Sequence, residues 1–127
     1  MATTSLAVLE LNHVALHVRD MEASNHFYGE LLGLPRLPRP DFNFDGAWYA
    51  FGNQELHLIA NPNHDPTPRF YTHFALRVAD AHAAHAALIE AGIAIHSGPG
   101  LRPDGAVQVY ILDPDGYLIE ITSFPDP

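Results

Sequence analysis

Apolar and polar residues alternate along this chain in an order that occurs twice. Residues 13–20, HVALHVRD, reappear as residues 73–80, HFALRVAD, with five of the eight positions identical. Each copy is followed by an alanine-bearing stretch whose apolar residues repeat at the spacing of one helical face, and then by short β runs. An internal repeat on this scale indicates one structural module that is present twice.

Each module is predicted to contain a strand, a helix and three more strands. Asp20 and Asp80 are predicted helix N-caps, because a short carboxylate accepts the free amide hydrogens of a helix's first turn. Gly33 and Gly92 suit the left-handed position that ends such helices. Runs of β-forming residues predict later strands over residues 46–51, 54–60, 106–112 and 117–123.

Prolines and glycines interrupt these elements at defined places. Three prolines within residues 35–40 restrict the second strand to an edge position or a very short segment. In the second module, His96 is predicted to end a strand before a glycine-containing loop over residues 97–105. The sequence Asp113-Pro114-Asp115-Gly116 predicts a tight turn, with proline at its second position and glycine at its fourth.

The whole chain of 127 residues fits a single domain that can bury a core. Prolines within residues 61–68 mark a linker between modules of about residues 5–60 and 69–124. We therefore predict an α+β fold of two tandem βαβββ modules. In this prediction the modules form a curved mixed sheet around a central pocket, and the helices lie on the outer face.

Strand alternation places several histidines on the face of the sheet that is opposite the helices. Successive strand residues point to opposite faces, so the wholly apolar set of each first strand should lie beneath the helices. Glu120 lies between two isoleucines, where a carboxylate is costly to bury without a partner. The repeat puts four side chains at equivalent positions on the non-helix face: His13, His57, His73 and Glu120.

This set of imidazoles and one carboxylate suits a divalent transition metal such as Zn, Ni, Mn or Fe(II). The alternative for any single strand histidine is an ordinary structural role. His57 suits two roles equally well, that of a metal ligand and that of a side chain that contacts a ligand without binding the metal. Glu55 fits either a base beside the metal or a polar residue at the edge of the pocket.

Composition excludes several other classes of function. The basic residues are six arginines without a basic stripe, and the net charge is -9, so nucleic-acid binding is not expected. The absence of cysteine excludes disulfides and thiolate metal sites. No apolar run is long enough to span a bilayer and no signal-peptide pattern opens the chain, so we expect a cytoplasmic protein without a membrane partner.

Four segments together resemble a known family. They are residues 11–16 (LNHVAL), 27–33 (FYGELLG), 71–74 (YTHF) and 113–120 (DPDGYLIE). In this combination and order the chain resembles the vicinal oxygen chelate superfamily over nearly its whole length. That superfamily contains glyoxalase I, fosfomycin-resistance thiol transferases, extradiol dioxygenases, methylmalonyl-CoA epimerase and bleomycin-resistance proteins.

The resemblance implies roles for particular residues. His13, His73 and Glu120 match the positions of metal ligands, and His57 matches a fourth ligand position at which glyoxalase I has Glu and the epimerase has Gln. It also implies a homodimer, and some members build each pocket from two chains. The substrate-binding residues that it implies are Trp48, Gln108 and Tyr110, with Phe42 and Phe44 at the mouth of the pocket.

Within the superfamily, the stretches around His13 and residues 71–74 look most like the fosfomycin transferases. Two departures count against that activity. Ala15 stands where those enzymes have threonine, and the loop 97–105 offers only Arg102 for an anionic phosphonate.

The resulting hypothesis is an enzyme whose metal chelates two adjacent oxygens of a small substrate and acts as a Lewis acid, as in a glyoxalase-like lyase or isomerase. Glu120 or Glu55 would serve as the base. Three alternatives stay open. They are an Fe(II) ring-cleaving dioxygenase, a thiol transferase of the same superfamily, and a metal-free, bleomycin-resistance-like protein that binds a cationic or aromatic molecule.

Overall fold

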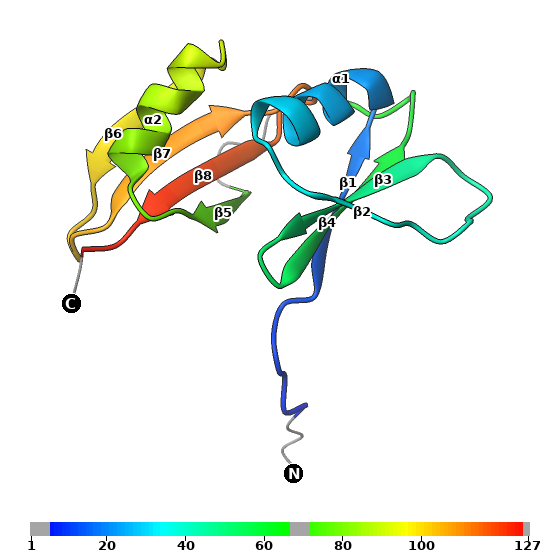
Figure 1. Ribbon diagram of the computed structural model, residues 1–127, viewed down its shortest axis with the longest axis horizontal. Helices are drawn as coiled ribbons and strands as arrows, with labels where there is room; N and C mark the ends of the chain where they lie inside the picture. The colour runs from blue at the N-terminus through cyan, green and yellow to red at the C-terminus, as the bar shows by residue number, and fades with distance from the viewer. Residues whose placement is uncertain (1–5, 67–71, 126–127) are drawn as a thin grey trace.

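The repeat in the sequence corresponds to two modules of the same topology in the computed structural model, which describes residues 6–66 and 72–125 (Figure 1). The first module consists of β1 (His13–Val18), α1 (Met21–Asn25), the π-helix η1 (His26–Leu31), β2 (Arg36–Leu37), β3 (Gly46–Phe51) and β4 (Gln54–Ala60). The second consists of β5 (His73–Arg77), α2 (Ala81–Glu90), β6 (Ile95–Leu101), β7 (Val107–Leu112) and β8 (Leu118–Ser123). The predicted linker 61–68, the predicted start of the second module at residue 69 and the motif residue Tyr71 lie partly or wholly outside the described residues.

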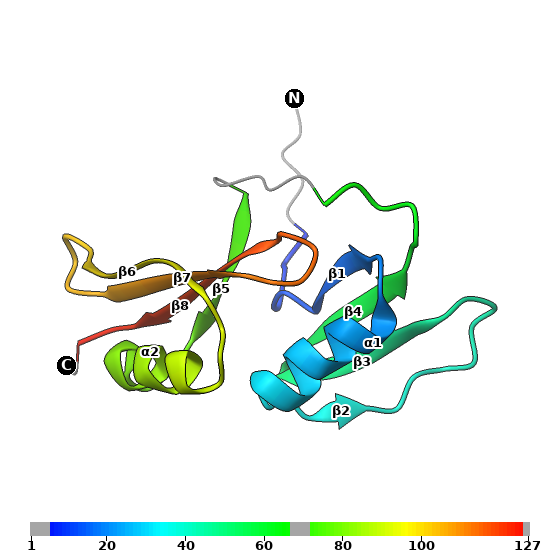
Figure 2. The same ribbon diagram turned by 90° about the horizontal axis from the view of Figure 1, so that it is seen from above.

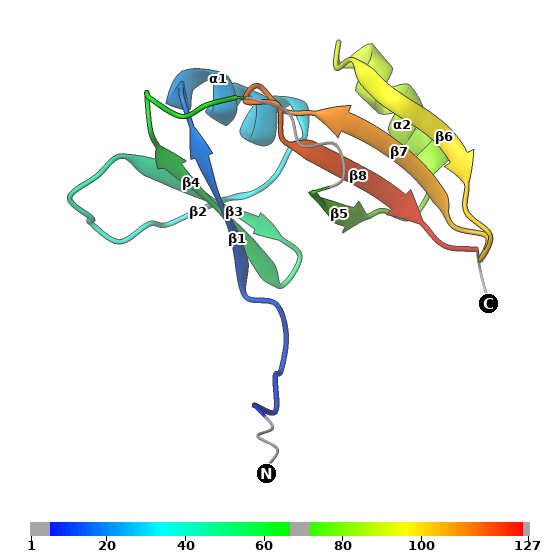
Figure 3. The ribbon, with the colours of Figure 1, turned by 180° about the vertical axis from the view of Figure 1, so that it is seen from behind.

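Each module forms its own four-stranded mixed sheet. The strand orders are β1-β4-β3-β2 and β5-β8-β7-β6, with the first and last strand of each module parallel and the other pairs antiparallel. The predicted α+β class and tandem modules are confirmed. The structure differs in one respect, because β1 and β5 are edge strands of two separate sheets in the described chain and do not join into one curved sheet around a pocket. Seen from behind, β5 is the edge of the second sheet that faces the first module (Figure 3).

The two helical segments, α1 continued by η1 and then α2, begin and end at the predicted residues. The Asp20 carboxylate accepts from the amides of Glu22 and Ala23, at 3.0 and 3.2 Å. Asp80 repeats this arrangement at the start of α2, with distances of 2.9 and 3.3 Å. Gly33 and Gly92 follow the two helical segments with φ of 71° and 80°, values that glycine adopts without steric cost.

The predicted end of a strand at His96 is wrong. β6 continues through residues that were predicted as a loop and pairs with β7 as far as Leu101, with two shifts of register. Gly98 lies within the second shift, between Ser97 and Gly100, with a φ of 92°. This left-handed residue lets an irregular segment remain hydrogen-bonded to β7, which the glycines alone did not indicate.

The helix-facing strand residues form the core, as the alternation predicts. Leu16, Val18, Leu56, Ile119 and Ile121 are all buried there. Figure 2 shows each module's helix against one face of that module's own sheet. Among the described residues, no helix combines the length and apolar character that crossing a membrane requires.

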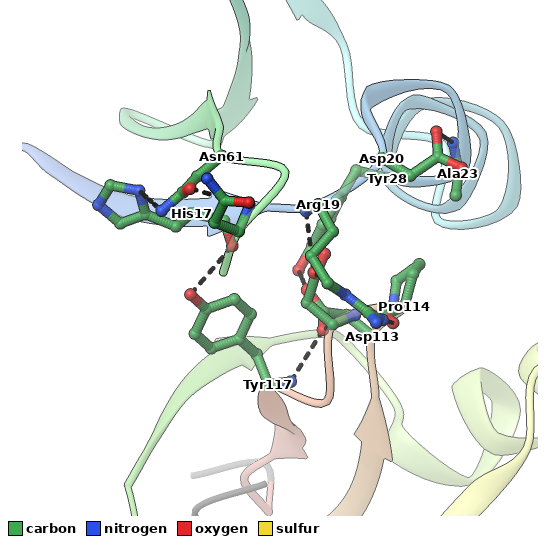
Figure 4. Close-up of polar contacts among 11 residues, drawn as sticks. His17, Arg19, Asp20, Ala23, Tyr28, Asn61, Asp113, Pro114 and Tyr117 are labelled. Atoms are coloured by element: carbon green, nitrogen blue, oxygen red, sulfur yellow. Dashed lines mark hydrogen bonds and ion pairs between the residues drawn. The ribbon is translucent and has the colours of Figure 1, made fainter. Parts of the chain in front are cut away.

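Polar side chains connect the two modules where β1 ends near the β7–β8 turn (Figure 4). Arg19 donates from its backbone amide and from Nε to Asp115 Oδ1, each at 3.0 Å. Tyr117 donates to the carbonyl oxygen of His17 at 3.0 Å, and Tyr28 donates to Asp113. We call these residues the inter-module junction.

Away from the junction, the modules border an open apolar groove of about 1020 Å³. Its lining comes from both modules and includes Val14, Phe51, Phe74, Leu76 and Leu88. The junction therefore fixes one end of the contact between the modules, and apolar surface stays accessible beside it.

Candidate functional site

The first group of predicted site residues lies on the face of the first sheet that is opposite the helices. Register pairs His13 with Glu55 across β1 and β4, and pairs His57 with Trp48 across β4 and β3. The rings of His13 and His57 are stacked, with centroids 4.1 Å apart and planes inclined by 17°. We call His13, Glu55 and His57 the first half-site.

Hydrogen bonds fix the orientation of both imidazoles. His57 Nε2 is 2.9 Å from Glu55 Oε1, and His13 Nδ1 is 2.7 Å from Asn12 Oδ1. The opposite face of the His57 ring stacks on Trp48, with centroids 4.0 Å apart and planes inclined by only 4°. His13 therefore keeps Nε2 for coordination, whereas His57 is held between two rings and shares its Nε2 with Glu55.

The second group lies on the corresponding face of the second sheet. His73 Nε2 is 3.1 Å from Glu120 Oε1, and the Tyr110 hydroxyl donates to the same oxygen at 2.9 Å. Gln108 Nε2 donates in turn to the Tyr110 hydroxyl at 3.2 Å. We call His73, Tyr110 and Glu120 the second half-site.

The second half-site explains how the sequence tolerates a carboxylate between two isoleucines. Glu120 is only 4% exposed, and its oxygen accepts from Tyr110 and meets the His73 ring. Burial, and then the hydrogen bond to Glu120 and its charge, raise the pKa of Tyr110, so the phenol keeps its proton and remains a donor. Within the described residues no arginine forms an ion pair with Glu120, which leaves a buried anionic group suited to a cation.

The structure brings His13 next to His57 and His73 next to Glu120, but it does not bring the two pairs together in one chain. Over residues 6–66 and 72–125, no group of three or more His, Cys, Asp or Glu side chains is close enough to hold a metal ion. Each half has donors of the right chemistry. The predicted ligand set of His13, His57, His73 and Glu120 is therefore divided between the two half-sites.

The sequence model of the Glyoxalase/Bleomycin resistance protein/Dioxygenase superfamily matches residues 10–121. The chain belongs to this superfamily. It is 30% identical to a lactoylglutathione lyase of Neisseria meningitidis, with 88% of each chain covered. It is 34% identical to the glutathione transferase FosA of Serratia marcescens, with 87% of this chain and 78% of that protein covered.

The fold agrees with that membership. A crystal structure from Bacillus anthracis, described as that of a glyoxalase family protein, matches with a TM-score of 0.84 and 28% identity. The match covers 96% of this chain and all of that one. The glyoxalase superfamily therefore accounts for both modules.

Aromatic side chains continue the first half-site toward the β2–β3 loop. Phe42 lies 6.0 Å from Trp48 and 5.3 Å from Phe44, measured between ring centroids. We call Phe42, Phe44 and Trp48 the aromatic shelf. The substrate-binding roles expected for these residues, and for Gln108 and Tyr110, stay predictions.

Two features were missed from the sequence, one beside the first half-site and one in the inter-module junction. Arg39 lies over the rings of Phe42 and Phe44, with its guanidinium carbon 4.8 and 4.9 Å from their centroids. An arginine among prolines, three and five residues before two phenylalanines, is the signal that could have indicated it. Tyr28 and Asp113 were not singled out as partners either, because 85 residues separate them.

Proposed function

We propose that the chain is a metal-dependent enzyme of the glyoxalase type, in which His13, His73 and Glu120 hold a divalent metal that binds two adjacent oxygens of a small substrate. The observation that carries this proposal is the buried Glu120 carboxylate beside His73, without an arginine partner in the described residues. A neutral imidazole and a carboxylate on one face are the donors that Zn, Ni, Mn and Fe(II) take in proteins. Similarity to a lactoylglutathione lyase and to the glutathione transferase FosA supports an enzyme of this superfamily.

The proposal includes a second copy of the chain, because one chain keeps its half-sites apart. A twofold axis can place the first half-site of one copy against the second half-site of the other, which gives two complete sites in a closed homodimer. The apolar groove between the modules supports this arrangement, as do the outer edges of β1 and β5, which pair with no other strand among the described residues. So does the apolar arm before β1, which extends away from both sheets (Figure 1) and exposes Leu6, Val8, Leu9 and Leu11.

The residues of each half-site divide the chemistry between them. When bound, the metal supplies Lewis acidity toward the substrate oxygens. Tyr110 holds Glu120 in one orientation through its hydroxyl. Glu55 is half-buried, and its carboxylate is fixed by His57. It is therefore suited to take a proton from the carbon next to a substrate carbonyl and to return it to the neighbouring carbon, as a lyase or isomerase requires.

Metal content measured on protein without a histidine tag tests this proposal. Wild-type protein grown with Zn, Ni, Mn or Fe(II) is expected to retain one metal ion for each chain. His13→Ala, His73→Ala and Glu120→Gln are each expected to lose it. His82→Ala is the matched control, because this histidine lies on the exposed face of α2 and should leave the metal content unchanged.

Co-expression of two variants tests whether each metal site is formed by two copies of the chain. In a mixed dimer of His13→Ala and His73→Ala, one site combines both lesions and the other combines two intact half-sites, so part of the metal content returns. His73→Ala with Glu120→Gln is the control, because both lesions fall in the second half-site and no mixed dimer regains an intact site. Wild-type protein that holds metal, with no recovery in either mixture, would rule out the shared site. Wild-type protein that holds no metal under any supplementation would rule out the metal enzyme and favour a metal-free binding protein.

A further inference from the structure

We propose that the substrate of this site is a planar aromatic compound with an anionic substituent, whose ring lies on the aromatic shelf and whose anionic group binds Arg39. This inference rests on the proposed function in one respect, since it names the substrate class of the same site. Its evidence is separate from the metal ligands. It comes from the stacking of the rings and from the surroundings of one arginine.

Trp48 belongs both to the aromatic shelf and to a row of three rings that stand side by side on the sheet. Trp48 and His57 are directly opposite each other on neighbouring strands, and their planes are nearly parallel. His13 continues the row on the far side of His57. Rings that stack along the direction from strand to strand turn their edges away from the sheet, so the exposed surface of the row is made of ring edges.

Ring edges favour one kind of ligand. The edge of an aromatic ring is electropositive and its face is electronegative. The flat face of a second aromatic ring therefore packs favourably across such a row, in the edge-to-face geometry. A saturated ring of the same size has no such face and gains only its apolar contact area.

Arg39 adds a positive charge on the aromatic shelf, where the Phe42 ring centroid lies 6.0 Å from that of Trp48. Its Nη2 donates to the carbonyl oxygen of Phe44 at 2.9 Å, and its guanidinium lies against both shelf phenylalanines. Gly46 provides the space, because a Cβ there would lie 3.1 Å from Arg39 Nε and Nη2. Arg39 is thus held in place from several sides.

The guanidinium has no carboxylate partner among the described residues, although the chain has fifteen acidic residues and only six basic ones. Most of its N–H donors remain for a ligand, and a guanidinium binds a carboxylate with two parallel hydrogen bonds. Arg36 differs, because it lies over the Tyr49 ring and donates to its hydroxyl at 3.4 Å. Arg39 is therefore the arginine that suits the anionic group of a ligand on the shelf.

The chain provides its own reporter for this interaction, since Trp48 is its single tryptophan. The indole N–H gives one NMR signal, and ring currents from an aromatic ligand on the shelf should shift it. The probes are 2-naphthoate, decahydro-2-naphthoate with the same charge but a saturated ring, and 2-naphthalenemethanol with the same ring but no charge. The titrations use full-length protein treated with EDTA, so their result does not depend on the metal.

We expect 2-naphthoate to shift the indole signal to saturation and to bind at least about tenfold more tightly than either other probe, a difference of about 1.4 kcal/mol. Arg39→Gln should weaken 2-naphthoate binding about tenfold, the usual scale for losing a charge-assisted hydrogen bond, and should leave 2-naphthalenemethanol binding unchanged. Arg36→Gln is the matched control and should bind all three probes like the wild type.

Equal affinity for 2-naphthoate and its saturated analogue, an unshifted indole signal, or full binding by Arg39→Gln would each overturn the proposal. Failure of the metal enzyme gives a different pattern. In that case the metal content is zero, yet 2-naphthoate still binds to the wild type and Arg39→Gln still weakens it.

Discussion

The hydroxyl of Tyr28 in the first module donates a 2.5 Å hydrogen bond to Asp113 Oδ2 in the second, and both side chains are buried. The other oxygen of the same carboxylate accepts from the amides of Asp115 and Tyr117, at 2.9 and 2.8 Å. Asp113 thereby shapes the β7–β8 turn and connects it to the helical segment of the other module (Figure 4). One carboxyl group links the local turn to the arrangement of the modules.

Replacing Tyr28 by Phe should destabilise the fold by about 1–3 kcal/mol, because it leaves a buried carboxyl oxygen without its donor. Urea unfolding followed by circular dichroism measures the change. Tyr117→Phe is the matched control, because its hydroxyl donates to an exposed backbone carbonyl and its loss should cost less than about 1 kcal/mol. Equal effects of the two variants would contradict the role assigned to Tyr28.

Alkaline pH should weaken the fold through the same contact. Burial, and then the nearby Asp113 charge, raise the pKa of Tyr28 well above its ordinary value of 10.0. A group whose pKa is higher in the folded state contributes its full stability below the unfolded pKa and loses it as the pH rises through the folded pKa. The free energy of unfolding should therefore fall above about pH 10, the ordinary pKa of tyrosine.

A pH series of urea midpoints on the wild type and Tyr28→Phe isolates this effect. The wild-type curve should fall more steeply above that pH, and the difference between the two proteins should shrink. Two curves that stay parallel throughout would assign the alkaline loss to other tyrosines, such as Tyr110 and Tyr117, whose pKa values burial also raises.

The irregular part of β6 should tolerate a methyl group at one glycine and not at another. Gly98 has a φ of 92°, and a Cβ there would collide with the backbone oxygen of Gln108. Gly98→Ala should therefore cost at least about 2 kcal/mol. Gly100→Ala is the control two residues away, where a Cβ meets nothing within 4 Å, and should stay within about 0.5 kcal/mol of the wild type. Similar midpoints in thermal or urea unfolding would contradict this description of the strand.

Removing the hydroxyl of Tyr110 should weaken metal binding without unfolding the protein. Tyr110→Phe takes away the donor that orients Glu120, and loss of a residue that orients a ligand typically costs about 10–100-fold in metal affinity. Competition with a chromogenic chelator measures the affinity. Tyr49→Phe is the control, because its hydroxyl donates to Asn25 within the first module, away from both half-sites. Unchanged affinity in Tyr110→Phe would remove Tyr110 from the site.

Local rules predicted much of this protein from its sequence. The caps at Asp20 and Asp80 depend on residues that are neighbours in the chain. The shared face of His73 and Glu120 follows from the alternation of side chains along each strand. The extension of β6 was missed because it depends on pairing with β7 across a left-handed glycine.

The separation of the half-sites could not be predicted in this way. Alternation assigns a side chain to a face of its sheet, but it contains no information about how two sheets lie relative to each other. That relation depends on contacts such as Arg19 with Asp115 and Tyr28 with Asp113, each formed by residues far apart in sequence. Whether the four predicted ligands meet therefore depends on how the modules dock. Each pair forms within its own sheet, His13 with His57 and His73 with Glu120, whereas bringing the two pairs together does not follow from the pattern of any one strand.

Within residues 6–66 and 72–125, the outer edges of β1 and β5 pair with no strand, and this bears on how the protein behaves when it is concentrated. Each edge presents a row of backbone amides and carbonyls that can accept a strand from any neighbouring molecule. In the proposed homodimer a second copy lies against this surface, so a chain without that copy stays open to irregular strand addition. Substitutions that weaken the proposed homodimer should therefore make the protein precipitate at temperatures at which each module is still folded.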